Sequence, residues 1–222
     1  MTIITEPRRA KQESTPIVLK GIAWETYESL REELDRSGQH MYLTYDRGAL
    51  EIMAPSPFHE KYKGLIGRYL EIMSLELNIP IASFGSTTFK REDIERGLEP
   101  DECYYVQHES SMGTRSDIDL LKDPPPDLAI EMDYSPHALD RESVYAALGV
   151  PEIWQYDGER LAGLARDADA NYRPIESSIA FPFLRLADVE RFLRESRGVS
   201  QDTSVRAFRD WVRKTFTPRG NS

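Results

Sequence analysis

The chain has 222 residues and a formal net charge of −10, from 28 basic and 38 acidic residues. This length suits one domain that buries a substantial core. The acidic balance argues against a protein that binds nucleic acid through its overall charge, although an acidic protein can still carry a local basic groove. The single cysteine, Cys103, excludes an internal disulfide and is typical of a reducing cytoplasm, where we expect the protein. No apolar run approaches the ~20 residues of a membrane span, so we expect no membrane association.

The domain organisation is predicted from composition along the chain. Residues 1–16 are polar and of mixed charge, and they lack the apolar core of a signal peptide, so we expect a disordered tail. Residues 17–217 contain no internal repeat and no convincing linker, which predicts a single domain. Residues 218–222 follow a proline and are expected to fray.

The first half of the chain shows helix, hairpin and strand signals in turn. Apolar residues at positions 24, 27, 30 and 34 predict a helix that ends at Gly38. Ser56 and Pro57 have the types that favour a helix N-cap and first turn, and the helix is expected to end near Asn78. The predicted strands are 41–45, 49–53, 79–83, 87–90 and 103–107, with a charged loop at 91–97.

The second half is predicted to contain a strand, a helix, a meander and two further helices. The helix is expected to begin at Ser135-Pro136 and to end near Leu148, with Gly149 as its stop. The meander strands are 152–157, 160–165 and 172–176, and the last helices are 186–195 and 205–216. An exposed edge of this meander could pair two subunits, so a homodimer is one expectation.

Acidic residues are concentrated around one predicted strand. From Asp127 to Asp133, acidic or small residues alternate with Leu128, Ile130 and Met132, which is the period of a strand with one apolar face. Upstream, Glu99-Pro100-Asp101-Glu102 opens another short strand. Carboxylates that converge from two strands form an oxygen-rich site suited to magnesium or manganese.

Two segments of the chain resemble a known family. They are GSTTFKREDIERGLEPDECYYVQ at 85–107 and PPDLAIEMDYSPHALDRESVYAALGVPEIWQYDG at 125–158. They resemble the Uma-type endonucleases, a bacterial family of the PD-(D/E)XK restriction-endonuclease-like superfamily, and the resemblance extends from about Trp24 to Trp211. It implies an α/β fold with a mixed β-sheet flanked by helices, to which a β-meander and C-terminal helices are added. It also implies a metal-dependent endonuclease that hydrolyses DNA.

The resemblance assigns the metal ligands. Asp101 matches the aspartate of the Pro-Asp motif and Glu131 matches the acidic residue of the following strand. With the backbone carbonyl of Met132, they would hold Mg²⁺, or Mn²⁺ in its place, against a scissile phosphate. Asp127 is either a further ligand or a turn former. The alternative for Asp101 and Glu131 is that both are ordinary surface acids at strand ends.

The lysine of the superfamily is absent, because Asp133 occupies its place on the strand. In many relatives the basic residue instead comes from the next helix, four residues before a tyrosine, and Arg141 matches that place. Arginine can clamp a phosphate and stabilise charge, but it stays protonated and is a poor general base. The alternative for Arg141 is a surface salt bridge to Asp140 or Glu142.

Three other residues near these motifs are less specific signals. His59 resembles a histidine at the start of the equivalent family helix and is a candidate catalytic residue, whereas a lone histidine on an apolar helix face is more often part of the core. Glu99 and Glu102 flank Asp101 and are expected to be solvated or structural.

Two further hypotheses remain open at this stage. A catalytically weak or inactive nuclease-fold protein could bind nucleic acid or a protein partner, and the acidic balance and Arg141 favour it. A glycoside hydrolase with two carboxylates is supported only by the acidic pairing and would not depend on a metal. The sequence gives neither the preferred DNA sequence or structure nor the biological role.

Overall fold

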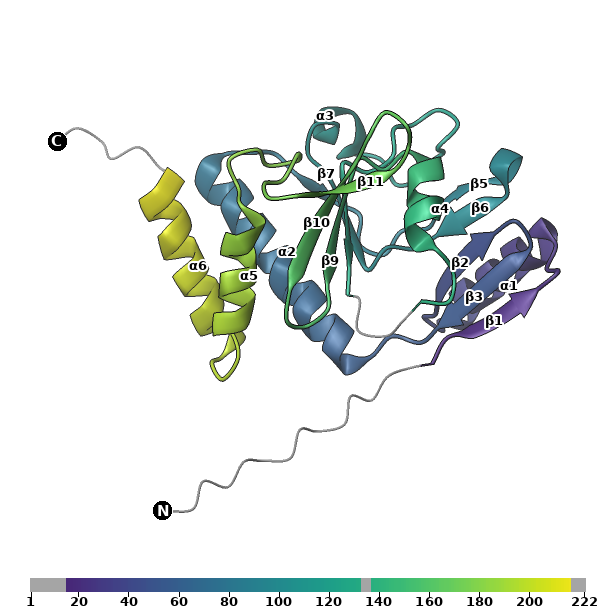
Figure 1. Cartoon of the computed structure of the whole chain (residues 1–222), viewed down its shortest axis with the longest axis horizontal. Helices are drawn as coiled ribbons and strands as arrows, with labels where there is room; N and C mark the ends of the chain where they lie inside the picture. The colour runs from purple at the N-terminus through teal and green to yellow at the C-terminus, as the bar shows by residue number, and fades with distance from the viewer. Residues whose placement is uncertain (1–14, 133–136, 217–222) are drawn as a thin grey trace, which may run out of the picture.

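The computed structural model describes residues 15–132 and 137–216. Within them the strands form two separate sheets, not the single mixed sheet expected (Figure 1). The α/β class itself is confirmed, with helices flanking both sheets. The residues that are candidates for function lie where the two sheets approach each other.

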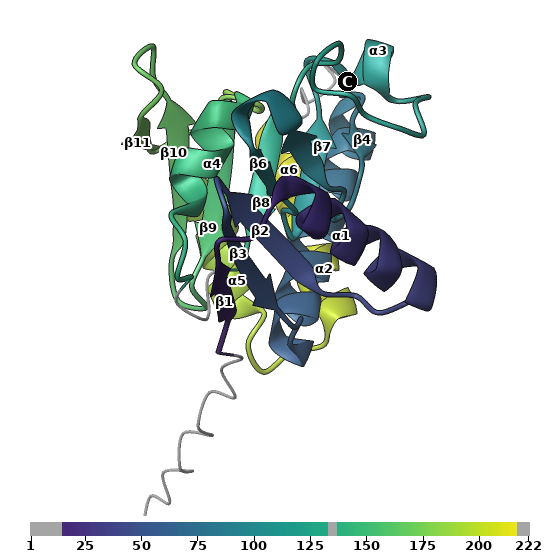
Figure 2. The same ribbon diagram turned by 90° about the vertical axis from the view of Figure 1, so that its right-hand side faces the viewer.

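The first sheet has five antiparallel strands in the order β1-β3-β2-β6-β5. These strands are β1 Ile17–Lys20, β2 Tyr42–Asp46, β3 Ala49–Met53, β5 Phe89–Arg91 and β6 Arg96–Leu98. Helix α1, Trp24–Ser37, covers one face of this sheet, where Trp24 and Tyr27 pack against Leu43, Tyr45 and Leu50 (Figure 2). Because side chains alternate along a strand, Tyr42 and Thr44 point to the opposite face.

The second sheet has six strands in the order β11-β10-β9-β8-β7-β4. They are β4 Ala82–Ser83, β7 Glu102–Tyr105, β8 Leu128–Glu131, β9 Glu152–Tyr156, β10 Leu161–Arg166 and β11 Tyr172–Ile175. Strands β8 and β9 are parallel and are joined through helix α4, Arg141–Leu148, whereas the other pairs are antiparallel. A parallel pair requires such a crossover connection.

The two faces of β8 enter different hydrophobic clusters. Leu128, Ile130 and Met132 pack in the cluster formed with α2 Pro57–Leu77, α5 Leu186–Glu195 and α6 Gln201–Phe216. Ala129 packs with Val144 and other residues of α4 on the opposite face. The predicted alternation of this strand is therefore confirmed, and it directs Glu131 towards α4. Figure 1 shows α4 between the two sheets, and α2, α5 and α6 on the far side of the second sheet.

Local signals account for the helix boundaries that the sequence predicts correctly. The Ser56 hydroxyl accepts the His59 N–H at the start of α2, and Asn78 ends that helix in the left-handed conformation with φ 53°. Gly38 and Gly149 end α1 and α4 with φ 68° and 86°, which glycine adopts at little cost.

Several expectations on local structure are wrong. Residues 91–97 are not simply a loop, because Glu92–Ile94 form a 3₁₀ turn and the three-residue β6 then pairs with both β2 and β5. Helix α6 begins at Gln201, earlier than expected, and neither β1 nor α3, Glu109–Met112, was predicted. Helix α4 begins at Arg141, while the expected start at Ser135-Pro136 and the position of Asp133 lie outside the described residues.

None of the described helices is both long enough and apolar enough to cross a membrane.

Candidate active site between the two sheets

Asp101 comes directly before β7, and Glu131 is the last residue of the neighbouring strand β8. Strands β7 and β8 are antiparallel with Glu102 opposite Ile130, so the next pair in this register is Asp101 and Glu131. Directly opposite residues in such a pair have Cα atoms about 5 Å apart and side chains on one face. Both carboxylates are buried, with exposures of 3 % for Asp101 and 5 % for Glu131. They are therefore not the exposed surface acids of the alternative interpretation.

A hydrogen bond joins the two strands at this point. The backbone N–H of Met132 donates to Asp101 Oδ2, with 2.6 Å between the two atoms. The bond fixes the Asp101 carboxylate against the end of β8, next to Glu131. A carboxylate that accepts a backbone N–H is held in one orientation.

Two side chains of α4 bind the same oxygen of Glu131. Arg141 Nη2 and the Tyr145 hydroxyl both donate to Glu131 Oε1. They are four residues apart and so lie on one face of the helix. Burial raises the pKa of Glu131, and the positive charge of Arg141 opposes this effect. Glu131 is therefore a buried carboxylate paired with a buried arginine.

The remaining contacts of Arg141 connect the two sheets. Its Nη1 donates to the Thr44 hydroxyl on β2, and its Nη2 donates to the backbone carbonyl of Glu99 at 2.8 Å. Since Nη2 also binds Glu131, both of its hydrogens are used within the protein. Arg141 is 7 % exposed, so the alternative of a surface salt bridge to Asp140 or Glu142 is wrong. Among the described residues no acceptor meets Arg141 Nε, so this N–H is the donor of the guanidinium that the expected phosphate clamp could use.

Glu51 is a buried acid near the site that the sequence interpretation missed. Its side chain is 1 % exposed and accepts hydrogen bonds from the His137 ring at 2.8 Å and from the N–H groups of Ala138 and Leu139. Burial alone would raise the pKa of Glu51, but these hydrogen bonds outweigh burial and lower it. Glu51 thus anchors the segment that leads into α4 and so helps to place Arg141.

The structure does not bring Asp127 to the carboxylate pair. Asp127 precedes β8 and lies four residues from Glu131, which is about 13 Å along a strand. Its carboxylate accepts the N–H groups of Val106 and His108, at 2.7 and 3.0 Å, and pairs with the His108 ring at 2.6 Å. Asp127 was expected to be either a further metal ligand or a turn former, and these hydrogen bonds agree with the turn former.

His59 is buried in the first turn of α2, with 1 % exposure. The neighbouring Glu60 is close enough for its charge to raise the pKa of Tyr42, which lies beside Asp101. This turn of α2 therefore approaches the Asp101 side of the site. The burial of His59 agrees with a core histidine, and its catalytic role stays a prediction.

Of the two expected alternatives for the acids that flank Asp101, solvated or structural, their contacts agree with the structural one. Glu99 is 6 % exposed, its carboxyl accepts a hydrogen bond from Thr88 at 2.7 Å, and burial raises its pKa to about 7. The contact of Glu99 with the candidate site is made by its backbone carbonyl, which accepts a hydrogen bond from Arg141. Glu102 accepts a hydrogen bond from Ser83 at 2.7 Å. Both residues have structural contacts.

The carboxylate pair fits a divalent ion held by two protein ligands. In the described part of the chain, no three or more His, Cys, Asp or Glu side chains are arranged to hold a metal together. The Met132 N–H binds Asp101 Oδ2, and the Tyr42 hydroxyl also lies against the Asp101 carboxylate. Arg141 and Tyr145 both bind Glu131 Oε1, which leaves Oε2 for a ligand. Magnesium is commonly bound by one or two carboxylates and completes its shell with water and phosphate oxygens. The donor set suits that mode of binding.

The α/β fold with helices flanking both sheets, and the two carboxylates at the adjoining ends of β7 and β8, are consistent with a restriction-endonuclease-like fold. The model of the family Uma2, described as "Putative restriction endonuclease", matches residues 24–200. The match covers most of the chain, and the protein belongs to this family. No curated protein matches the chain.

Proposed function

We propose that the protein is a metal-dependent endonuclease that hydrolyses phosphodiester bonds of DNA. The observation that carries this proposal is the buried pair Asp101 and Glu131 at the adjoining ends of β7 and β8, where Glu131 Oε2 is not engaged by the hydrogen bonds of the described residues. Membership of a family described as restriction endonucleases supports the reaction class. We infer a cytoplasmic location, because the one cysteine is buried and forms no disulfide, as is usual in a reducing compartment.

Asp101 and Glu131 would hold Mg²⁺, or Mn²⁺ in its place. The bound ion would polarise the scissile phosphate and increase the acidity of the attacking water. Asp101 is oriented for this role by the Met132 N–H, and Glu131 by Arg141 and Tyr145. The positive charge of Arg141 reduces the repulsion between the carboxylates and an approaching phosphate. Arg141 itself stays protonated and does not act as a base.

The test is a cleavage assay on supercoiled and linear DNA with Mg²⁺, Mn²⁺ or a chelator. Asp101→Asn and Glu131→Gln remove one charge each with little change of shape, and both are expected to lower cleavage by about 100-fold or more. Glu33→Gln changes an exposed carboxylate on α1 and serves as the control. Cleavage that persists in both site variants at the rate of the control would refute the proposed site.

The second candidate is a catalytically weak or inactive protein that binds nucleic acid or a protein partner. The specific observation in its favour is that Arg141 and Tyr145 already occupy one oxygen of Glu131. The two candidates differ in divalent binding, because an inactive binder has no requirement for the ion. Calorimetry with Mn²⁺ on the wild type and on Asp101→Asn separates them, since only the endonuclease predicts binding that the substitution weakens.

A further inference from the structure

Thr44 and Glu51 are directly opposite residues of the antiparallel strands β2 and β3. Such side chains lie on one face of the sheet, with their Cβ atoms about 5 Å apart. Thr44 binds Arg141 Nη1, and Glu51 Oε1 binds His137 Nδ1 at 2.8 Å. One face of the first sheet therefore holds His137 and Arg141 close to each other, and Arg141 in turn binds Glu131.

The position of His137 also shows in the electrostatics of Glu131. Burial raises the pKa of Glu131, and the positive charges of Arg141 and of a protonated His137 oppose this effect. The histidine is thus near enough to the carboxylate for the two charges to interact. It lies on the side of the candidate site that is formed by the first sheet and by the residues leading into α4.

The ring of His137 has the arrangement of a histidine that accepts protons. Glu51 has a lowered pKa despite its burial, so it is ionised near neutral pH and accepts the Nδ1–H of the ring. The lone pair of the neutral ring is then on Nε2, for which the described residues provide no partner. The His137 side chain is 14 % exposed, so Nε2 can exchange protons with water. A carboxylate that orients one ring nitrogen in this way fixes the tautomer of the base.

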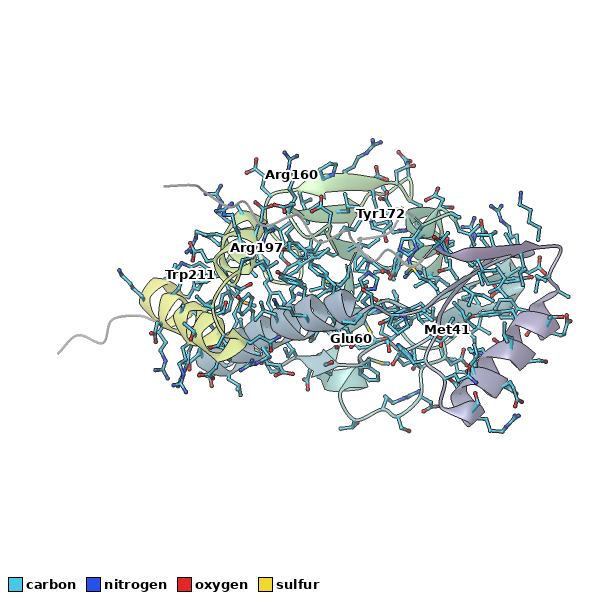
Figure 3. The ribbon with its side chains drawn as sticks, turned by 90° about the horizontal axis from the view of Figure 1, so that it is seen from below. Met41, Glu60, Arg160, Tyr172, Arg197 and Trp211 are labelled. Atoms are coloured by element: carbon cyan, nitrogen blue, oxygen red, sulfur yellow. The ribbon has the colours of Figure 1, made fainter. Side chains whose placement is uncertain are left out.

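The neighbour of Asp101, by contrast, is a proton donor. Burial raises the pKa of Tyr42, and the charges of Asp101 and Glu60 raise it further. Figure 3 shows Glu60 at the start of α2, close to Met41, the residue that precedes Tyr42. A hydroxyl in this field donates to the carboxylate and does not take a proton from water.

Hydrolysis of a phosphodiester releases a proton from the attacking water, which requires an acceptor. Arg141 stays protonated, and burial raises the pKa of Tyr145 well above its usual value, so both side chains on α4 are donors. Histidine ordinarily changes its charge between about pH 5 and 8, which suits it to this task near neutral pH.

We propose that His137 is a further catalytic residue, whose Nε2 accepts a proton from the water that attacks the scissile phosphate. This inference rests on the proposed function, because it places that phosphate at Asp101 and Glu131. The water oxygen forms a bond to phosphorus, its proton passes to Nε2, and the bond from phosphorus to the leaving sugar oxygen breaks. The leaving oxygen takes a proton from solvent, and the imidazolium returns its proton to solvent. Glu51 stabilises the charged ring in the meantime.

The experiment compares His137→Asn with His108→Asn. The amide of an asparagine can replace Nδ1–H as a donor to the carboxylate, but it has no counterpart of Nε2. His108 is a matched control, because its Nδ1 also pairs with a carboxylate, that of Asp127, and Asp127 precedes the first residue of β8 whereas Glu131 is the last. Cleavage is measured with Mg²⁺ across about pH 5 to 9. DNA binding is measured by fluorescence anisotropy with Ca²⁺ in place of Mg²⁺, and Mn²⁺ binding without DNA by calorimetry.

We expect His137→Asn to lower the cleavage rate at neutral pH by about 100-fold or more, with DNA binding and Mn²⁺ affinity unchanged. The wild type should cleave faster as the pH rises through the range in which histidine loses its proton, and the variant should lose this dependence. The charged groups around the ring are Glu51 on β3, Glu131 on β8 and Arg141 on α4, and the variant keeps all of them. His108→Asn should cleave as the wild type does.

Two further measurements separate a base from a residue that only orders the segment before α4. In His137→Ala, added imidazole should restore part of the cleavage, because it can take the place of the missing ring. Nitrogen-15 NMR of the histidine rings, recorded without metal or DNA, should show the neutral His137 ring protonated at Nδ1. Its signal is identified by its loss in the variants.

Several results would overturn the inference. Equal cleavage in His137→Asn and His108→Asn at every pH would show that the ring takes no part in the reaction. A loss of Mn²⁺ affinity would make His137 a ligand of the ion, and weaker DNA binding that accounts for the whole loss of cleavage would make it a DNA contact. A neutral ring protonated at Nε2, or a folded His137→Ala that imidazole does not rescue, would also refute the base.

The failure of this inference is distinguishable from the failure of the proposed function. Cleavage that Asp101→Asn abolishes and His137→Asn does not would leave the endonuclease intact and refute the role of His137. A wild type that does not cleave DNA would remove the reaction and the base together.

Discussion

Glu131 and Arg141 form an ion pair in which each side chain is only 7 % exposed. Their backbones belong to β8 and α4, and further hydrogen bonds of Arg141 reach the first sheet. The pair is therefore both a part of the candidate site and a link between the two halves of the fold. Buried pairs of this kind are costly to break on one side, because the charge that remains is left in an apolar environment.

Arg141→Met should destabilise the protein by about 3–5 kcal/mol, because it leaves the Glu131 carboxylate buried without its cation. The double variant Glu131→Leu/Arg141→Met should recover a large part of that loss, since no buried charge remains. Chemical denaturation of the wild type, both single variants and the double variant measures the coupling. If the double variant loses as much unfolding free energy as the two single variants together, the prediction is contradicted.

Glu51 should make the stability dependent on acid pH. Its pKa is lowered in the folded protein by the hydrogen bonds from His137, Ala138 and Leu139, despite the opposing effect of burial. A carboxyl with a lowered folded pKa stabilises the fold above its unfolded pKa, about 4.3, and this contribution disappears as the pH falls through the folded value. The wild type should therefore exceed Glu51→Gln in unfolding free energy at pH 7.

That difference should shrink as the pH is lowered from about 5 to 3. Urea denaturation of both proteins across this range measures the difference. The other carboxyls titrate in both proteins, so their contribution is removed when one unfolding free energy is subtracted from the other. A difference that stays constant with pH would show that the charge of Glu51 is not what anchors the segment before α4.

Gly97→Ala should destabilise the contact between β6 and α1. A Cβ atom at position 97 would lie 2.6 Å from the Tyr27 hydroxyl and 3.1 Å from Lys90 Cβ. Tyr27 is fully buried, so its ring has little room to move, and a cost of about 1–3 kcal/mol is expected. The measurement is the midpoint of thermal unfolding.

Tyr27→Phe is the matched rescue for this clash. The Tyr27 hydroxyl has no hydrogen-bond partner within the described residues, so its removal alone should cost little. In the double variant the added methyl group no longer meets the hydroxyl oxygen. If Gly97→Ala is equally harmful with and without Tyr27→Phe, the contacts with Lys90 Cβ at 3.1 Å and with the ring carbon Cζ of residue 27 at 3.2 Å are the cause.

Cys103 should be unreactive in the native protein. It is fully buried and donates to the Gly85 carbonyl at 3.3 Å, and burial raises the pKa of its thiol. Because the thiolate is the reactive form, a thiol reagent should modify it only when the structure opens. Labelling with iodoacetamide in buffer and in urea tests this, and fast labelling in buffer would contradict the burial of β7.

The alternation from Leu128 to Met132 could be read from the sequence because one face of β8 packs on apolar helices and the other on α4. The choice of Asp101 and Glu131 came from the resemblance of two segments to a known family, because the acids at these strand ends could also have been ordinary surface residues. The structural role of Asp127 could not be predicted. Its carboxylate binds the N–H groups of Val106 and His108, which lie in a turn without a strong sequence signal.

The contribution of the first sheet to the site could not be predicted either. Thr44 contacts α4, and Glu51 contacts the residues just before it, across about 90 positions of sequence, and no local pattern reports such contacts. A partial signal existed at Glu51, which is an acid inside the apolar strand β3 and therefore requires a buried partner. The division into two sheets escaped prediction because β6 has only three residues and contains a glycine.

The hydrogen bond from the Met132 N–H to Asp101 has a consequence for amide exchange. Ligand-binding elements are usually drawn from the parts of a protein that open most readily. Here the amide lies at the end of β8, which has β7 on one side and β9 on the other, and its acceptor is 3 % exposed. Deuterium should therefore enter this position only when the centre of the six-stranded sheet separates, so the candidate site should exchange with the slowest amides of the fold.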